Sequence, residues 1–456
     1  MKVHFIAVGG SIMHNLAIAL KLKGYEVSGS DDEIFEPSYS KLQEHGILPD
    51  EMGWHPERIT EDLDAVILGM HARIDNPELL KAKALGVKVY SFPEYVYKQA
   101  HDKKRVVIAG SHGKTTVTSM IVHVLNENGK NPDYLIGAQV KGLPQSVKLT
   151  EEAEMIIIEG DEYLTSPMDR QPKFLKYHHH IAVITGIAWD HINVFPTYEE
   201  YVQQFQRLLD LTPSHGAIFY SKSDKELLKL MEKQKFSSSI KAVGYEAQPH
   251  EIQEGNTVLT GTTPPTPLKV FGNHNLENIS AAYHVCKALG LSDQEFYQGI
   301  STFEGASLRM QLLAEKSGTK IFRDFAHAPS KVKATVAAVH GQFEGQKLLA
   351  CLELHTFSSL NKAFIHEYKG SMNAAEEAIV YYSPHTVEHK RLEAINPEEI
   401  SEAFDHPNLT VFTDANKLKE YLRNYELTGH HLLLMTSGSF EKTDLKTFAE
   451  ELTAGL

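Results

Sequence analysis

The sequence has few cysteines, few tryptophans and no long hydrophobic run, and these shortages exclude several classes of protein. Its 456 residues include two cysteines, Cys286 and Cys351, too few and too far apart for a disulfide framework. No stretch approaches the roughly 18 consecutive apolar residues that a membrane-spanning helix needs. The first residues read as a β-strand rather than as a signal peptide. We therefore expect a cytoplasmic protein with no membrane partner.

The chain also lacks an excess of basic residues. Its formal net charge is −14, which argues against a nucleic-acid partner. Apolar residues make up 42% and charged residues 23%, an ordinary globular mixture. An anionic substrate must therefore be held by local donors, since the overall field would repel it.

Short apolar runs alternate with amphipathic stretches along the whole chain, which predicts parallel sheets flanked by helices. Breaks in this rhythm divide the chain into three α/β domains, 1–98, 99–304 and 305–456. The expected strands are Val3–Val8, Glu26–Ser30, Ala65–Leu68, Val87–Ser91, Arg105–Ala109, Met155–Glu159, Ile181–Gly186, Lys320–Asp324, Leu348–Glu353, Ala378–Tyr382, Thr410–Thr413 and Leu432–Thr436. Helices are expected at Met13–Lys23, after Pro329 and after Leu360, and a hairpin or loop at Thr260–Pro267.

A glycine-rich segment between a strand and a helix predicts a phosphate-binding loop. Its glycines allow backbone N–H groups to face a phosphate, and the following helix N-terminus favours negative charge. A lysine there can reach the terminal phosphates of ATP, and the next hydroxyl can bind Mg²⁺. The residues are Gly110, Ser111, His112, Gly113, Lys114, Thr115 and Thr116.

Carboxylates follow the strand that ends at Glu159, in the run Glu159-Gly160-Asp161-Glu162. Carboxyl ends of parallel strands meet at one edge of the sheet, where ligands bind. Beside a phosphate loop, such carboxylates are suitable Mg²⁺ ligands. A later strand is followed by Asp190-His191, so His191 is a further candidate for the same metal.

These motifs, with Asn273-His274-Asn275 and Asp324-Phe325-Ala326-His327, occur in an order that resembles the Mur ligase family over essentially the whole chain. The resemblance implies an N-terminal Rossmann-like domain that binds a UDP-sugar and a central phosphate-loop domain that binds ATP. It also implies a C-terminal Rossmann-like domain that binds the amine substrate. The expected reaction is ATP-dependent formation of an amide bond in bacterial cell-wall metabolism, through an acyl phosphate.

The resemblance also assigns roles to residues. Lys114, Asp324 and His327 would be catalytic, and Asn275, Arg309 and Asp324 would join the phosphate loop in binding ATP. Mg²⁺ would be held by Thr115, Glu159 and His191. The substrates would lie near Gly10, Ser11, Ser30, Asp31, His71, Ala72 and His355.

Within the family, the chain is most similar to members that attach L-alanyl-γ-D-glutamyl-meso-diaminopimelate to UDP-N-acetylmuramate in peptidoglycan recycling. Phe35–Ser40 and Asp190–Phe195 carry this similarity. Alanine-adding members usually have His-Arg-Tyr where this chain has His355-Thr356-Phe357. We therefore expect the peptide as the amine, with L-alanine as the alternative.

Three departures from the family pattern stand out. Ala7 replaces a usual glycine, His14 and Asn15 replace small residues, and Arg323 replaces an acidic residue. Two other classes of function stay open. A simple phosphate-loop kinase or ATPase would need no N-terminal or C-terminal α/β domain, and a non-catalytic UDP-sugar-binding regulator would not need the intact phosphate loop.

Overall fold

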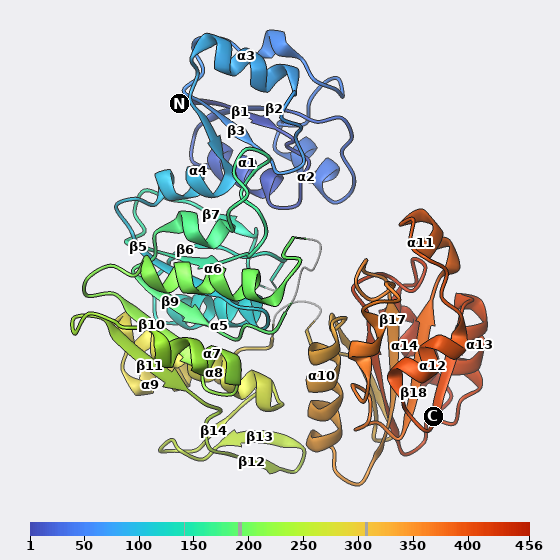
Figure 1. The fold of residues 1–456 in the computed structure, drawn as a ribbon. Helices are drawn as coiled ribbons and strands as arrows, with labels where there is room; N and C mark the ends of the chain where they lie inside the picture. The colour runs from blue at the N-terminus through green and yellow to red at the C-terminus, as the bar shows by residue number, and fades with distance from the viewer. Residues whose placement is uncertain (141, 190–193, 306–308) are drawn as a thin grey trace. The chain divides into compact units, whose positions relative to one another are not determined.

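The computed structural model describes residues 1–140, 142–189, 194–305 and 309–456 (Figure 1). It contains three α/β domains that group into two compact units. The first unit comprises 1–246 and 278–299, and holds the N-terminal and central domains. The second comprises 247–277 and 300–456, so the segment 247–277 belongs with the C-terminal domain.

The N-terminal domain is built on a four-stranded parallel sheet with the order β2-β1-β3-β4. Its helices begin and end at identifiable signals: Asn76 caps α3, and Gly86 ends that helix in the left-handed conformation. The elements are β1 (Lys2–Ile6), α1 (Met13–Leu22), β2 (Glu26–Ser30), α2 (Ser38–Glu44), η1 (Pro56–Arg58), β3 (Ala65–Leu68), α3 (Pro77–Leu85), β4 (Val89–Ser91) and α4 (Phe92–Gln99).

The central domain contains a seven-stranded sheet with the order β11-β10-β9-β5-β8-β6-β7, parallel except for β7. Strand β5 lies in its middle, and its carboxyl end leads into the phosphate loop. The elements are β5 (Lys104–Ala109), α5 (Lys114–Glu127), β6 (Asp133–Leu135), β7 (Val147–Lys148), β8 (Met155–Glu159), η2 (Lys173–Tyr177), β9 (Ile181–Ile184), α6 (Tyr198–Asp210), β10 (Ala217–Ser221), α7 (Lys225–Lys233), β11 (Lys241–Tyr245), α8 (Asn273–Ala288) and α9 (Asp293–Ile300).

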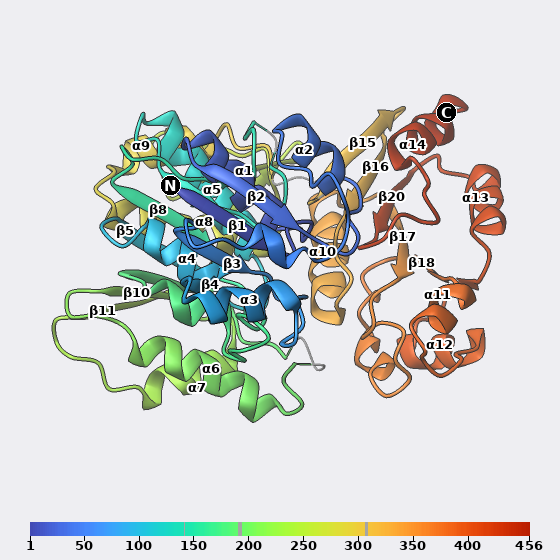
Figure 2. The same ribbon diagram turned by 90° about the horizontal axis from the view of Figure 1, so that it is seen from above.

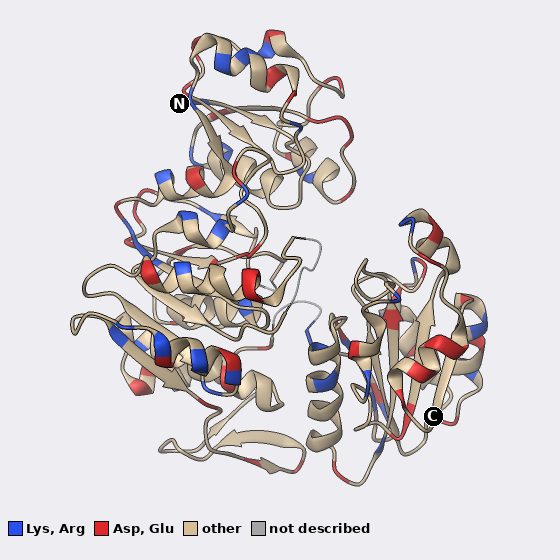
Figure 3. Cartoon of the chain, viewed as in Figure 1, with Lys and Arg blue, Asp and Glu red and all other residues tan. Residues whose placement is uncertain are grey.

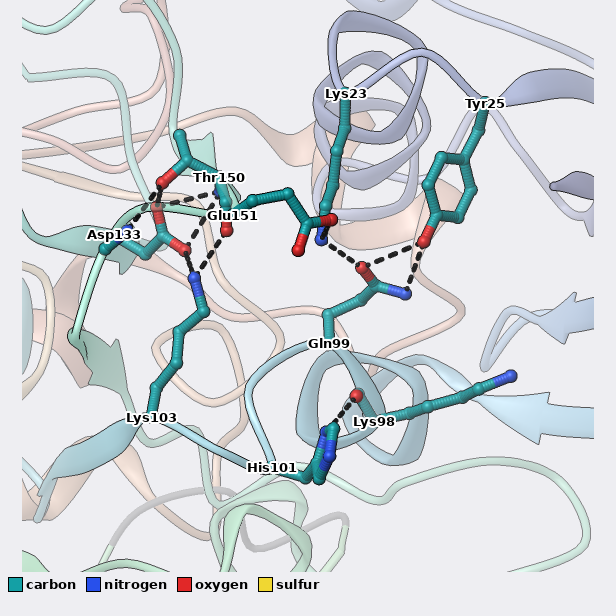
Figure 4. A network of polar contacts seen from close by, with 10 residues as sticks. Lys23, Tyr25, Lys98, Gln99, His101, Lys103, Asp133, Thr150 and Glu151 are labelled. Carbon is teal, nitrogen blue, oxygen red and sulfur yellow. Dashed lines mark hydrogen bonds and ion pairs between the residues drawn. The ribbon is translucent and has the colours of Figure 1, made fainter.

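Polar contacts join the two domains of the first unit, as Figure 4 shows. The Lys23 ammonium at the end of α1 donates to Gln99 Oε1 over 2.9 Å and lies 2.8 Å from Glu151 Oε1. Nearby, Lys103 Nζ is 2.7 Å from Asp133 Oδ2, and both side chains are almost fully buried. These contacts tie α1 and the segment after α4 to the edge of the central sheet.

The second unit contains a six-stranded sheet with the order β15-β16-β20-β17-β18-β19 and a separate three-stranded antiparallel sheet, β12-β13-β14. Only β15 is antiparallel in the larger sheet. The elements are β12 (His250–Gln253), β13 (Asn256–Leu259), β14 (Thr266–Pro267), β15 (Gln311–Lys316), β16 (Thr319–Asp324), α10 (Pro329–Gln342), β17 (Lys347–Leu354), η3 (Ile365–Tyr368), β18 (Glu377–Tyr382), α11 (Pro384–His389), α12 (Pro397–Phe404), β19 (Leu409–Phe412), α13 (Ala415–Asn424), β20 (His430–Met435) and α14 (Leu445–Ala454).

Helices cover both faces of the six-stranded sheet (Figures 1 and 2). Side chains of α10 and α12, such as Val336 and Phe404, form one core with Leu352. Side chains of α13 and α14 form a second core on the opposite face, where Leu434 lies. The near-continuous apolar strands of the sequence are explained by this burial on both sides.

The predicted fold class is confirmed, and nearly every predicted strand is present within two residues of its expected ends. The helix expected after Leu360 is wrong, because the chain forms only the short 3₁₀ segment η3 there. Asn361 accepts the N–H of Ala363 with its side chain, a local bond that competes with a regular helix. The expected hairpin at Thr260–Pro267 is part of the three-stranded sheet.

None of the described helices is long and apolar enough to cross a membrane. Figure 3 shows Lys and Arg interspersed with Asp and Glu along the helices of both units. Charges of both signs are therefore distributed along the helices of each unit, and local groups must supply any anion site.

Candidate active site

The two glycines of the phosphate loop are required by its geometry. Gly110 has φ +122°, and a Cβ there would lie 2.4 Å from Thr185 Oγ1. Gly113 has φ +75°, and a Cβ there would lie 2.4 Å from Asn278 Oδ1. Side chains other than hydrogen would meet both the backbone strain and a steric clash. The loop thus leaves backbone N–H groups at the start of α5, where a phosphate can be bound.

Hydrogen bonds hold the rest of the loop against the neighbouring strand. The Ser111 N–H donates to the carbonyl of Gly186 over 2.9 Å, and the Ser111 Oγ accepts the Ala188 N–H over 3.0 Å. The His112 carbonyl accepts a hydrogen bond from the Thr185 hydroxyl. Thr116 is buried in the first turn of α5. These contacts fix Ser111, His112 and Thr116 as parts of the loop's frame.

Lys114 binds an acidic partner from the end of β8. Its Nζ lies 2.8 Å from Glu162 Oε2 and donates to the Gly110 carbonyl over 2.6 Å. Burial lowers the pKa of the Lys114 ammonium, but the neighbouring carboxylates, chiefly Glu162, raise it above its ordinary value. Lys114 is therefore positively charged, as a group that neutralises phosphate charge must be.

Two of the three predicted metal ligands lie in contact. The Thr115 hydroxyl donates to Glu159 Oε1 over 2.7 Å, and Glu159 Oε2 accepts the Gly137 N–H over 2.7 Å. Burial raises the pKa of Glu159. A hydroxyl and a carboxylate beside a phosphate loop are the oxygen donors that Mg²⁺ prefers, so these residues fit the ion. The third predicted ligand, His191, lies outside the described residues.

Two partners of the loop were missed by the sequence analysis. Asn278 in α8 lies against Gly113, and Glu162, which the sequence places only within an acidic run, pairs with Lys114. Asn278 follows three residues after the predicted Asn275, one helical turn further along α8. Helical periodicity could have suggested it once Asn275 was a candidate, but no local motif marks it.

The predicted UDP-sugar residues lie at the carboxyl edge of the N-terminal sheet. Gly10 is half-buried and Ser11 is exposed after β1, and His71 is exposed after β3. The Asp31 carboxylate accepts the Gly9 N–H over 2.7 Å, which holds the first glycine-rich loop against the end of β2. Burial raises the pKa of Asp31 to about 6, although the Gly9 hydrogen bond opposes this shift.

Two other predicted substrate residues are buried. Ser30 is fully buried, and its Oγ accepts from the Arg58 guanidinium over 3.4 Å. Its carbonyl accepts the Ala7 N–H over 2.9 Å. Ala72 is buried as well. Ser30 and Ala72 therefore lie inside the domain, at the edge of the sheet and in its core. A ligand could contact only the groups that surround them.

The departures in the first loop are accommodated locally. Ala7 adopts φ +65°, the left-handed conformation that usually favours glycine. His14 is buried and lies 2.9 Å from Ser38 Oγ and 3.0 Å from the Gly10 carbonyl. Burial lowers the pKa of His14, so its imidazole is neutral. Asn15 donates to the Ser11 carbonyl over 2.8 Å. The larger side chains of His14 and Asn15 thus stabilise the loop by contacts with the carbonyls of Gly10 and Ser11.

The second unit brings together the other predicted residues. Asp324 is buried at the end of β16 and accepts the N–H groups of Met310 over 2.7 Å and Ala326 over 2.8 Å. The Arg309 guanidinium lies over the Phe325 ring, 4.9 Å from its centroid. Asp324 therefore organises the backbone around Arg309, and its carboxylate oxygens are used within the unit.

His327 and Asn275 are held by backbone groups of the same unit. His327 Nδ1 lies 2.9 Å from the Phe325 carbonyl, and the His327 carbonyl accepts a hydrogen bond from the Tyr368 hydroxyl. Asn275 donates to the Phe271 carbonyl over 2.8 Å. His355 is half-buried after β17, against Gly438.

Family models match three consecutive parts of the chain. Residues 2–104 match "Mur ligase family, catalytic domain", residues 108–286 match "Mur ligase middle domain", and residues 308–439 match "Mur ligase, glutamate ligase domain". The matched parts together cover most of the chain and meet near the boundaries between its sheets.

Individual relatives agree with this match. The UDP-N-acetylmuramate–L-alanine ligase of Carboxydothermus hydrogenoformans is 30% identical over 98% of this chain and 96% of the relative. The Escherichia coli UDP-N-acetylmuramate–L-alanyl-gamma-D-glutamyl-meso-2,6-diaminoheptandioate ligase is 25% identical over 96% of both chains. The crystal structure of the Thermotoga maritima UDP-N-acetylmuramate–alanine ligase has a TM-score of 0.72 at 19% identity, covering 100% of both chains.

Proposed function

The chain belongs to the Mur ligase family of ATP-dependent amide-bond ligases, and we propose that it joins the carboxylate of UDP-N-acetylmuramate to the amine of L-alanine. The observation that carries this proposal is the 30% identity, over 98% of the chain, to a relative named for that reaction. The peptide-adding relative from E. coli is 25% identical. The comparisons therefore favour L-alanine, the alternative amine in the sequence-based prediction, over the peptide.

A carboxylate and an amine do not condense in water, so the carboxylate must first be activated. In the proposed reaction, a carboxylate oxygen attacks the γ-phosphorus of ATP, and ADP leaves. The amine then attacks the acyl carbon, loses a proton, and expels inorganic phosphate. The phosphate thus carries away one oxygen from the carboxylate. Positioning and charge neutralisation are the protein's main contributions to such a transfer.

The phosphate loop would bind the ATP phosphates in the proposed reaction. Lys114 would exchange its contact with Glu162 for the phosphate oxygens and stabilise the charge that develops on them. Thr115 and Glu159 would hold Mg²⁺, which neutralises phosphate charge when bound. Asn275 and Arg309 of the second unit would contact the nucleotide, and His327 and Asp324 would support that contact.

The N-terminal domain would bind the UDP-sugar at the edge formed by the first loop. Gly10 and Ser11 supply surface backbone there, and Asp31 holds the loop in place. Because the net charge is −14, the overall electrostatic field of the protein repels an anionic substrate. These local donors must overcome that repulsion. The altered residues His14 and Asn15 lie beneath this loop and are compatible with such a role.

A second candidate is an L-alanyl peptide as the amine. It is favoured by Thr356, because alanine-adding members usually carry an arginine at this position that could grip the carboxylate of free L-alanine. Here the Thr356 hydroxyl donates to Ser359 Oγ over 2.9 Å and carries no charge. Only an arginine offers a charged, bidentate fork to a carboxylate.

The experiment is phosphate release measured with UDP-N-acetylmuramate and each amine separately. We expect ATP turnover only when both UDP-N-acetylmuramate and an amine are present, with L-alanine preferred over L-alanyl-γ-D-glutamyl-meso-diaminopimelate. Preference for the peptide at equal concentration would replace the first candidate with the second. ATP turnover that needs neither substrate would contradict both.

A further inference from the structure

A charged side chain near the end of β16 forms no ion pair with any residue that the structure describes. Arg323 is half-buried, and its Nε is buried without a hydrogen-bond partner. Among the described residues, no carboxylate lies within ion-pair distance of its guanidinium. Burial lowers the pKa of Arg323 while the carboxylate of Glu353 opposes this, so the group stays charged. A buried Nε–H group without a hydrogen-bond partner is costly unless something binds it.

Arg323 lies near the carboxyl edge of the sheet, one residue before the end of β16. It follows Ile321 by two residues on β16 and therefore shares its face of the sheet. Ile321 belongs to the core beneath α13 and α14, together with Leu434 of the neighbouring β20. Glu353, near the end of β17, lies on this same face, two residues after Cys351. Arg323 and Glu353 thus lie on the same face of the sheet, near its carboxyl edge.

The loop after β20 closes tightly around Glu353. Glu353 Oε2 accepts the Phe440 N–H over 3.0 Å and a hydrogen bond from the Thr436 hydroxyl. A Cβ at Gly438 would lie 2.9 Å from Glu353 Oε2 and 2.8 Å from His355 Cγ. Only glycine allows this approach. The carboxylate of Glu353 is therefore fixed by one backbone N–H and one side-chain hydroxyl of this loop.

The same loop stores backbone strain. Phe440, Glu441 and Lys442 have φ of 43°, 55° and 62°, so three consecutive residues other than glycine are left-handed. Such residues normally occur singly, because each places its Cβ too close to a carbonyl. The Tyr381 hydroxyl holds this turn by donating to Glu441 Oε1 over 2.8 Å. Strain of this kind persists where the surrounding structure holds it, and it gathers at binding sites.

We propose that Arg323 binds the carboxylate of the amine substrate, L-alanine in the proposed reaction, beside Glu353 and His355. This assignment rests on the proposed function, since it names a recognition group for the second substrate. It accounts for the neutral Thr356, because the charge that grips the carboxylate is supplied from β16 instead of from the segment after β17. It also gives the unpaired guanidinium a partner of opposite charge.

The test compares L-alanine with L-alaninamide, which has the same amine but no carboxylate. In the wild-type enzyme, we expect kcat/KM for L-alanine to exceed that for L-alaninamide. In Arg323→Ala, kcat/KM for L-alanine should fall by about ten- to a hundredfold, mainly through KM, with little change for L-alaninamide. The ratio of the two effects cancels the different basicities of the amines. Arg323→Lys should recover part of the loss, since it keeps the charge but not the fork.

Lys347→Ala serves as the control, because Lys347 is exposed at the opposite end of β17. It removes one positive charge from the same unit and should leave both amines unaffected. Equal losses with L-alanine and L-alaninamide in Arg323→Ala would show a structural role and overturn the assignment. A raised KM for ATP with unchanged amine discrimination would also overturn it. Wild-type enzyme inactive with both amines would overturn the proposed function, and this assignment with it.

Discussion

Replacing Lys114 should lower both the stability of the protein and its turnover rate, for two different physical reasons. Lys114 and Glu162 form an ion pair whose side chains are 14% and 1% exposed, so the pair lies in a poorly solvated place. Lys114→Met removes the cation from a buried carboxylate, and breaking a buried pair costs about 3–5 kcal/mol. A loss of 1 kcal/mol lowers the melting temperature of a unit of this size by roughly 2–4 °C, so the melting temperature should fall by about 10 °C.

The rate should fall for a different reason. Loss of one preorganised charge contact to the transferred phosphate costs about 10²–10³ in kcat. The double variant Lys114→Met with Glu162→Gln removes both charges, so we expect it to regain most of the lost melting temperature. It should not regain the rate, because no group replaces the ammonium at the phosphate.

A matched control comes from Lys103, whose Nζ pairs with the buried Asp133 away from the phosphate loop (Figure 4). Lys103→Met should lower melting by a similar amount and leave kcat per folded enzyme nearly unchanged. Melting followed by calorimetry and phosphate release below the melting transition separate the two effects. A Lys114→Met enzyme with more than about a tenth of the wild-type rate would refute the reasoning.

Three further predictions follow from local geometry. Gly113→Ala should weaken ATP binding by at least about tenfold in calorimetry, because its Cβ would clash at φ +75°, whereas Gly129→Ala, at φ +69° with open space, should not. Because burial raises the pKa of Asp31 from 3.8 to about 6, this carboxyl ionises at a higher pH in the folded protein than in the unfolded chain. The contribution of Asp31 to stability should then decrease as pH rises from about 4 to about 6, so the stability difference between wild type and Asp31→Asn should change over this range; a difference that does not vary with pH would contradict this. Thr115→Val should raise the Mg²⁺ concentration for half-maximal rate by about tenfold, unlike Thr118→Val one turn later.

The phosphate loop and most strands could be predicted because their signals are local. A strand buried on both faces must be continuously apolar, and a loop that approaches phosphate must contain glycine. Lys114 and Glu159 follow from such patterns, because one opens a helix and the other ends a strand. The same reasoning predicted a helix after Leu360 wrongly, since propensity does not reveal the local side-chain bond of Asn361.

Long-range partners could not be predicted from local patterns. Asn278 is 165 residues beyond Gly113, and no local motif marks it as the residue of α8 that meets the loop. The grouping of 247–277 with the C-terminal domain likewise depends on tertiary packing. Arg323 could be noticed as a departure from the family pattern, but the burial of its Nε without a hydrogen-bond partner emerged only with the sheet around it.

The most direct test of the central claim follows oxygen atoms through the reaction. UDP-N-acetylmuramate labelled with ¹⁸O in its carboxylate is incubated with ATP, L-alanine and the enzyme, and the released phosphate is analysed by mass spectrometry. Attack of the carboxylate on the γ-phosphorus predicts one ¹⁸O atom in each phosphate released, with the amide product formed in equal amount. Unlabelled phosphate, or labelled UDP-N-acetylmuramate recovered unchanged while ATP is consumed, would contradict the account.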